Sequence, residues 1–76
     1  MHSEESTYEI YLRGHLGEVW KVRFEDMDMK LDFDLHGDPL TILTGQISDQ
    51  AALHGMLATF RDAGIPIISV NRTDLK

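Results

Sequence analysis

Carboxylates are the side chains of this sequence that gather most densely. Six occur between residues 25 and 38: Glu25, Asp26, Asp28, Asp32, Asp34 and Asp38. Converging carboxylate oxygens bind hard cations such as Mg²⁺ and Ca²⁺. Asp28, Asp32 and Asp34, however, alternate with apolar residues, and neighbours on one strand face stand about 6.6 Å apart without converging. The spacing therefore favours a charged strand that deters edge-to-edge pairing over a metal site.

The histidines and serines complete no catalytic or metal-binding pattern. The four histidines are His2, His15, His36 and His54. They do not have the HExxH or HxH spacing of a metal site, and the sequence has no cysteine to join them as a ligand. Ser48, Asp49 and His54 supply the residue types of a nucleophilic triad, but no nucleophile-elbow motif contains the serine. We therefore expect no enzymatic activity, no metal and no cofactor.

Length and charge narrow the remaining function classes. The 76 residues make one small domain, and we expect a disordered tail over residues 1–6 and a folded domain over 7–73. The formal net charge of -6 repels phosphate backbones, so no nucleic acid partner is expected. The sequence lacks cysteine, a membrane-length apolar run and the features of a signal peptide. These features predict an acidic cytoplasmic protein that does not bind a membrane.

Alternation of apolar and polar residues predicts four strands. The clearest is Met27–Leu35, where apolar residues alternate with charged ones. Turn residues follow at His36–Pro39, and the chain resumes as a strand over Leu40–Ile47, which predicts an antiparallel hairpin. The proline fits only at the start of the second strand. The other two strands are expected over residues 8–13 and 65–72.

A helix is expected from an N-cap at Ser48 or Asp49 to about Ala63. Gly64 stands where a left-handed residue ends a helix. Gly55, inside this helix, costs about 1 kcal/mol relative to alanine. A glycine at this position indicates either that another backbone or a ligand approaches the helix closely at Gly55, or only that the helix packs on the sheet. The helix carries an apolar stripe for the sheet: Leu53, Met56, Leu57 and Phe60.

The segment His15–Asp26 fits two patterns. Leu16, Val19, Trp20 and Phe24 have the spacing of a helix face, whereas alternation after Trp20 also suits a strand. A helix gives the order β-α-β-β-α-β, which predicts a two-layer α+β ferredoxin-like sandwich with both helices on one face of a four-stranded antiparallel sheet. An extended segment gives an antiparallel meander with one helix.

The sheet face without helices is the predicted interaction surface. Tyr11, Leu43 and Ile67 are expected there among charged residues, which is typical of an association surface, although scattered apolar residues are also normal on a sheet. The full predicted face is Glu9, Tyr11, Arg13, Asp28, Lys30, Asp32, Asp34, Thr41, Leu43, Ile67, Ser69 and Asn71.

One stretch resembles a known family. Residues 44–55 read T-G-Q-I-S-D-Q-A-A-L-H-G, and residues 68–70 read I-S-V. With the earlier Y-E-I strand and R-G-H-L segment, they resemble a family of small uncharacterised prokaryotic proteins with the pattern T-G-x-[VI]-x-D-Q-A-A-L-H-G. The family has no assigned activity, so the resemblance implies none for this chain.

The resemblance has two structural implications. It favours the helical interpretation of residues 15–26, where relatives hold alanines. It also marks Asp49, Gln50 and His54 as polar positions to test. Asp49 and Gln50 equally suit the cap and first turn of a helix.

Two functions from different classes follow. The first is a non-enzymatic protein-interaction or self-associating module, a homodimer for example, that uses the open sheet face. The second is a small-ligand-binding regulatory domain of the ACT-like kind, with a site near the Gly14–Glu18 loop. Ligand-induced thermal stabilisation distinguishes the two.

Overall fold

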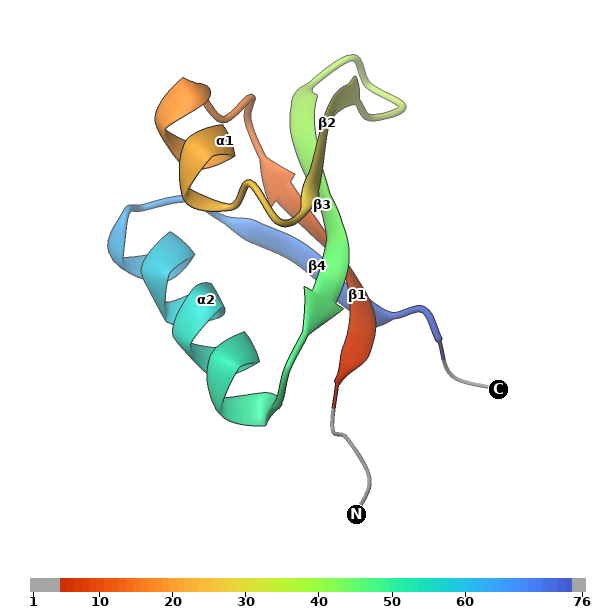
Figure 1. The fold of residues 1–76 in the computed structure, drawn as a ribbon. Helices are drawn as coiled ribbons and strands as arrows, with labels where there is room; N and C mark the ends of the chain where they lie inside the picture. The colour runs from red at the N-terminus through yellow and green to blue at the C-terminus, as the bar shows by residue number, and fades with distance from the viewer. Residues whose placement is uncertain (1–4, 75–76) are drawn as a thin grey trace.

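Four strands form one antiparallel sheet in the computed structural model, which describes residues 5–74. The strands are β1 (Ser6–Arg13), β2 (Asp28–Phe33), β3 (Pro39–Ile47) and β4 (Ile67–Arg72), in the spatial order β2-β3-β1-β4. Helices α1 (Glu18–Arg23) and α2 (Gln50–Asp62) lie on the same side of this sheet (Figure 1). The predicted ferredoxin-like α+β sandwich is confirmed, and the meander alternative is wrong.

The ends of the domain are partly tied into the sheet. Residues 1–4 of the expected tail lie outside the described residues, whereas Ser6 is the first residue of β1 and pairs with Ile47. At the other end, the N–H of Thr73 donates a hydrogen bond of 2.9 Å to the carbonyl of Thr7. Ser6, which was expected in the tail, is therefore part of the sheet.

The core lies between the sheet and the helices. β1 alternates strictly and buries Tyr8, Ile10 and Leu12 toward the helix side. Phe60 of α2 is fully buried against them. The remaining buried members of this cluster come from β3 and α2: Leu43, Ile47 and Leu53.

Leu43 lies in this core, so its predicted place on the open face is wrong. Its exposed fraction is 0%, and it pairs with Ile10 of β1 and Met29 of β2. Directly paired residues share a face of a sheet. The residues around Leu43 on β3 are apolar or β-branched, so alternation alone did not predict which of them face the core. By the same pairing, Ile42 shares the open face with Tyr11.

Ile67 also departs from its predicted position. The pairing of β1 with β4 runs from Tyr11–Ser69 to Leu12–Ile67, which leaves Ile68 without a partner as a bulge. Ile67 is therefore opposite the inward-facing Leu12 and no longer in the row of Tyr11. The bulge shifts by one residue the alternation of inward-facing and outward-facing side chains on β4, and no pattern in the sequence predicts this shift.

Helix α2 has both of its predicted ends. The side chain of Asp49 accepts a hydrogen bond of 2.8 Å from the N–H of Ala52, which makes Asp49 the N-cap. At the other end, Gly64 has a φ of 76°. The N–H of Ile65 donates to the carbonyl of Phe60, and that of Gly64 to Arg61, as in a Schellman motif.

Helix α1 confirms the helical interpretation of residues 15–26 but spans only six residues. A helix of this length is not stable by itself in water. Its N-cap is Gly17, which has no side chain to accept a hydrogen bond from the first turn of the helix. Trp20 and Phe24 pack against the core as expected, whereas Val19 of the predicted stripe is 78% exposed. The helix therefore depends on two aromatic side chains.

Gly45 permits a close crossing of two segments. A Cβ added at Gly45 would lie 2.8 Å from Cγ and 3.3 Å from Cα of Met27, the residue that leads into β2. At Gly55, in contrast, an added Cβ would meet nothing within 4 Å. The close approach considered at Gly55 is therefore not made within the described chain, and Gly45 is the glycine that packing requires.

We predict that Gly45→Ala destabilises the fold by about 1–3 kcal/mol, because Met27, whose Cγ would lie 2.8 Å from the added Cβ, must shift. The matched control, Gly55→Ala, adds the same methyl group in open space and should stabilise the fold by up to about 1 kcal/mol. Chemical denaturation measures both free energies of unfolding. Effects of the same sign in the two variants would contradict this account.

Candidate functional site

A pocket separates helix α1 from the edge strand β2. Its volume is about 310 Å³. The loop before α1 and the helix itself provide one side, and β2 provides the other: Leu16, Gly17, Glu18 and Lys21, with Met29 and Leu31. Three apolar side chains and one side chain of each charge therefore border the same space.

Thr41 fixes the loop that forms the pocket. Its hydroxyl donates a hydrogen bond of 2.7 Å to the carbonyl of Gly14 and accepts one of 3.0 Å from the N–H of Leu16. Thr41 is fully buried, so these bonds satisfy a polar group inside the core. Gly14 has a φ of 90°, which a side chain would disfavour. The loop before α1 is thus anchored to the centre of the sheet.

His15 and Phe33 meet at the same end of β2. Their rings lie 4.9 Å apart in an edge-to-face arrangement. Nε2 of His15 is 2.8 Å from the carbonyl oxygen of Asp32, which can only accept, so this nitrogen carries a proton. His15 therefore holds the loop against β2 while leaving Phe33 60% exposed.

Large apolar side chains remain uncovered around this pocket. Leu31 and Phe33 alternate with charged residues on β2 and face the helix layer, yet Leu31 is 51% exposed. Val19 and Val22 of α1 are exposed as well, and Leu35 in the turn after β2 is fully exposed. We call Met29, Leu31 and Phe33, the helix-side face of β2, the β2 surface. The helix layer covers it only in part.

Asp34 organises the turn between β2 and β3. Its Oδ1 accepts hydrogen bonds from the N–H of Asp38 and of His36, at 3.0 and 2.8 Å, and its Oδ2 accepts one of 3.0 Å from Nη1 of Arg13. The backbone donor of Asp38 in particular stabilises the charged carboxylate. It lowers the pKa of Asp34 below 3.8 against the opposing effect of desolvation, with His36 and Arg13 adding to it.

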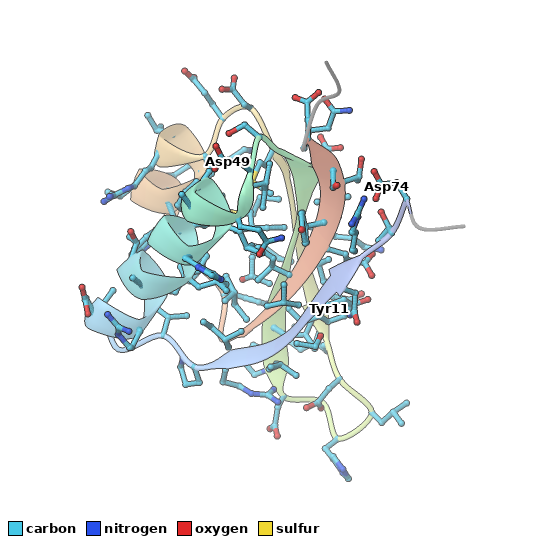
Figure 2. The ribbon with its side chains drawn as sticks, turned by 90° about the horizontal axis from the view of Figure 1, so that it is seen from below. Tyr11, Asp49 and Asp74 are labelled. Atoms are coloured by element: carbon cyan, nitrogen blue, oxygen red, sulfur yellow. The ribbon has the colours of Figure 1, made fainter. Side chains whose placement is uncertain are left out.

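The three residues of the predicted interaction surface do not come together. Tyr11 lies half-buried on the side of the sheet away from α2 and Asp49 (Figure 2). Leu43 is on the opposite face, in the core, and Ile67 precedes the bulge at Ile68 on the edge strand β4. The open face therefore carries fewer of the predicted apolar side chains than the sequence pattern indicated.

The three polar positions marked by the family motif lie along α2. Asp49 caps the helix, and Nε2 of Gln50 donates a hydrogen bond of 3.2 Å to the hydroxyl of Tyr8. Both side chains are thus engaged in the fold. His54 is exposed on the helix. These positions and the pocket beside β2 involve different elements.

Over residues 5–74, no three His, Asp or Glu side chains lie close enough together to hold a metal ion. No helix of this described part is long and apolar enough to cross a membrane.

Fold and surface together define a small α+β sandwich with an incompletely covered edge strand. The chain belongs to the family described as "Domain of unknown function (DUF8691)", whose model matches residues 7–71. No curated protein and no solved structure matches the chain. The expected membership of an uncharacterised family is confirmed.

Sequence reasoning indicated the Gly14–Glu18 loop beside the pocket but missed the other residues that build it. Lys21 had no assigned role, and Thr41 was expected on the open face. The signal for Thr41 was a single polar residue in the apolar run Leu40–Leu43, which is typical of a buried hydroxyl with a specific partner. Leu31 and Phe33 were expected inside, because the alternation of β2 does not tell how far a helix extends over it.

We predict that the carboxyl of Asp34 titrates below pH 3.8 in a carbon-detected NMR titration. Since its pKa is lower in the folded state, the stabilisation is complete above the unfolded pKa and is lost as pH falls through the folded pKa. Asp34→Asn should lower stability at pH 7 and weaken its dependence on pH below 5. Asp62→Asn, at an exposed ion pair, is the control and should leave stability at pH 7 unchanged. A midpoint at or above 3.8 for Asp34 would contradict the assignment.

Proposed function

We propose that this chain is a non-enzymatic, cytoplasmic association module whose contact surface is the β2 surface. One observation carries the proposal: Leu31 and Phe33, on an edge strand, are 51% and 60% exposed although their alternation marks them as core-facing. Edge strands with exposed apolar residues tend to pair with another chain. Binding at the β2 surface would therefore remove the large apolar side chains of Leu31 and Phe33 from water.

Three other exposed apolar residues lie in the same region, whereas Ile67 and Ile68 are exposed on the opposite edge strand, β4. Val19 and Val22 belong to α1, whose neighbouring residues line the pocket beside β2, and Leu35 follows β2 directly. Clustered apolar exposure is typical of an interaction site. The open face offers less, because Tyr11 and Ile42 are each half-buried.

The engaged polar side chains support a non-enzymatic role. Asp34 holds a turn, Asp49 caps a helix, Gln50 bonds Tyr8 and Thr41 fixes a loop. Each has a structural partner that accounts for its chemistry. We further propose that the T-G-x-[VI]-x-D-Q-A-A-L-H-G pattern marks the family, that its members are prokaryotic, and that Asp49 and Gln50 belong to the pattern for these folding roles.

A second function is favoured by the pocket. It borders the Gly14–Glu18 loop, where the regulatory-domain hypothesis places a ligand. Leu16, Met29 and Leu31 suit an apolar group, and Glu18 and Lys21 suit a molecule that carries both charges, such as an apolar amino acid. This candidate shares the β2 surface with the first.

We predict that a photoreactive phenylalanine analogue at position 33 cross-links to a protein in the native cell, and that the same analogue at position 11 does not. Both substitutions exchange one aromatic ring for another, and Tyr11 tests the open face directly. Cross-linking at position 11 alone, or at neither position, would contradict the proposed surface.

For the ligand candidate, we predict thermal stabilisation by an apolar amino acid. A ligand at 100 times its Kd adds about 2.7 kcal/mol of stability. Lys21→Ala should weaken the effect, whereas Arg61→Ala, at the far helix, should not. A screen of amino acids, nucleotides and metal ions that stabilises neither the native chain nor these variants would exclude this second function.

A further inference from the structure

The outer edge of β2 presents a defined set of backbone groups. The N–H of Asp34 donates to the carbonyl of Asp38, so the backbone of Asp34 faces β3. Backbone groups alternate in direction along a strand. Met29, Leu31 and Phe33 therefore direct their N–H and C=O groups away from β3. In agreement, the N–H of Phe33 is bonded at 2.7 Å to the side chain of Asp32 and not to a strand.

A second copy of this chain can pair with that edge in antiparallel fashion about a two-fold axis. Matching the outward-facing backbone groups leaves two long registers within Asp28–Phe33. The first is centred on Lys30 and places Lys30 against Lys30 and Asp28 against Asp32. Like charges directly opposite are destabilising, so this register is disfavoured.

The second register is centred on Leu31 and has complementary charges on both sides of its centre, with a like-charged pair at each end. It places Lys30 of each copy opposite Asp32 of the other, and Leu31 opposite Leu31. At the two ends, Asp28 faces an Asp34 whose carboxylate is already 3.0 Å from Arg13. The charge pattern of β2 therefore selects one register for self-pairing.

The same register covers the β2 surface. Phe33 of the second copy is opposite Met29, which lines the pocket with Leu31. Residues directly opposite have Cβ atoms about 5 Å apart. The incoming ring would therefore lie beside the pocket, and by symmetry each copy would provide one ring to the other. The two exposed apolar residues of β2 gain an apolar partner at once.

Asp32 changes partner in this arrangement. Within one chain its carboxylate accepts from the N–H of Phe33, and its Oδ2 lies 3.9 Å from Nζ of Lys30. Pairing would transfer the N–H of Phe33 to a carbonyl of the second copy and free the carboxylate for Lys30 across the seam. Self-pairing thus replaces the two contacts of Asp32 within one chain by contacts between the two copies.

We propose that the chain forms a two-fold homodimer through antiparallel pairing of β2 with β2, centred on Leu31. This inference rests on the proposed function and names the partner as a second copy. The result is a continuous eight-stranded sheet with an α1 helix on each side of the seam.

Charge reversals at the seam test the register. Sedimentation of the native chain should show a mass rising from 8.7 kDa to twice that value with concentration. Lys30→Glu places like charges opposite at two symmetric positions and should raise the dissociation constant by about tenfold. The double variant Lys30→Asp with Asp32→Lys restores opposite charges and should recover the dimer. Arg61→Glu, an equal change of charge on α2, should leave it unchanged.

Three results would overturn the dimer. They are a monomer at all concentrations, a Lys30→Glu variant that dimerises as the native chain does, and a double variant that does not recover although circular dichroism shows it folded. The cross-links formed from position 33 show whether only the dimer is wrong or the proposed contact surface is wrong as well. An adduct to a different protein would overturn the dimer and retain the surface, whereas no adduct would overturn both.

Discussion

The packing of Trp20 and Phe24 on Phe60 determines how the helix layer covers the sheet. The rings of Trp20 and Phe24 lie 5.6 and 5.4 Å from the fully buried ring of Phe60, and they stack on each other at 6.1 Å. Aromatic pairs at such distances stabilise by about 0.5–1.5 kcal/mol beyond the area that they bury. A six-residue helix without a side-chain cap is not stable by itself in water. Helix α1 therefore lies where Phe60 holds it.

The position of α1 has a consequence for β2. Helix α2, with thirteen residues and two caps, covers the centre of the sheet, and α1 leans on it through the aromatic cluster. The edge strand is left with a pocket between it and α1, and with Leu31 and Phe33 partly uncovered. The aromatic cluster thus completes the core and leaves Leu31 and Phe33 partly exposed at the edge of the sheet. One arrangement of three rings links the stability of the fold to its proposed function.

Local signals in the sequence predicted five of the six elements and left residues 15–26 open between helix and strand. Alternation identified β1 and β2, Asp49 and Gly64 identified the ends of α2, and the element order gave the sandwich. Phase within β3 was not accessible, because Leu40, Ile42 and Leu43 are all apolar and only pairing with Ile10 and Met29 selects Leu43 for the core. The bulge at Ile68 and the length of α1 depend on tertiary contacts as well. The candidate site follows from these contacts, so the sequence indicated its loop, Gly14–Glu18, but not its strand.

Amide hydrogen exchange of the native chain, followed by NMR at low and high protein concentration, tests most directly whether the β2 edge is an association surface. The account predicts that the outward-facing N–H groups of Met29 and Leu31 exchange more slowly as concentration rises, while those on the outer edge of β4 do not change. Exchange at Met29 and Leu31 that is independent of concentration, or protection that develops at β4 instead, would contradict it.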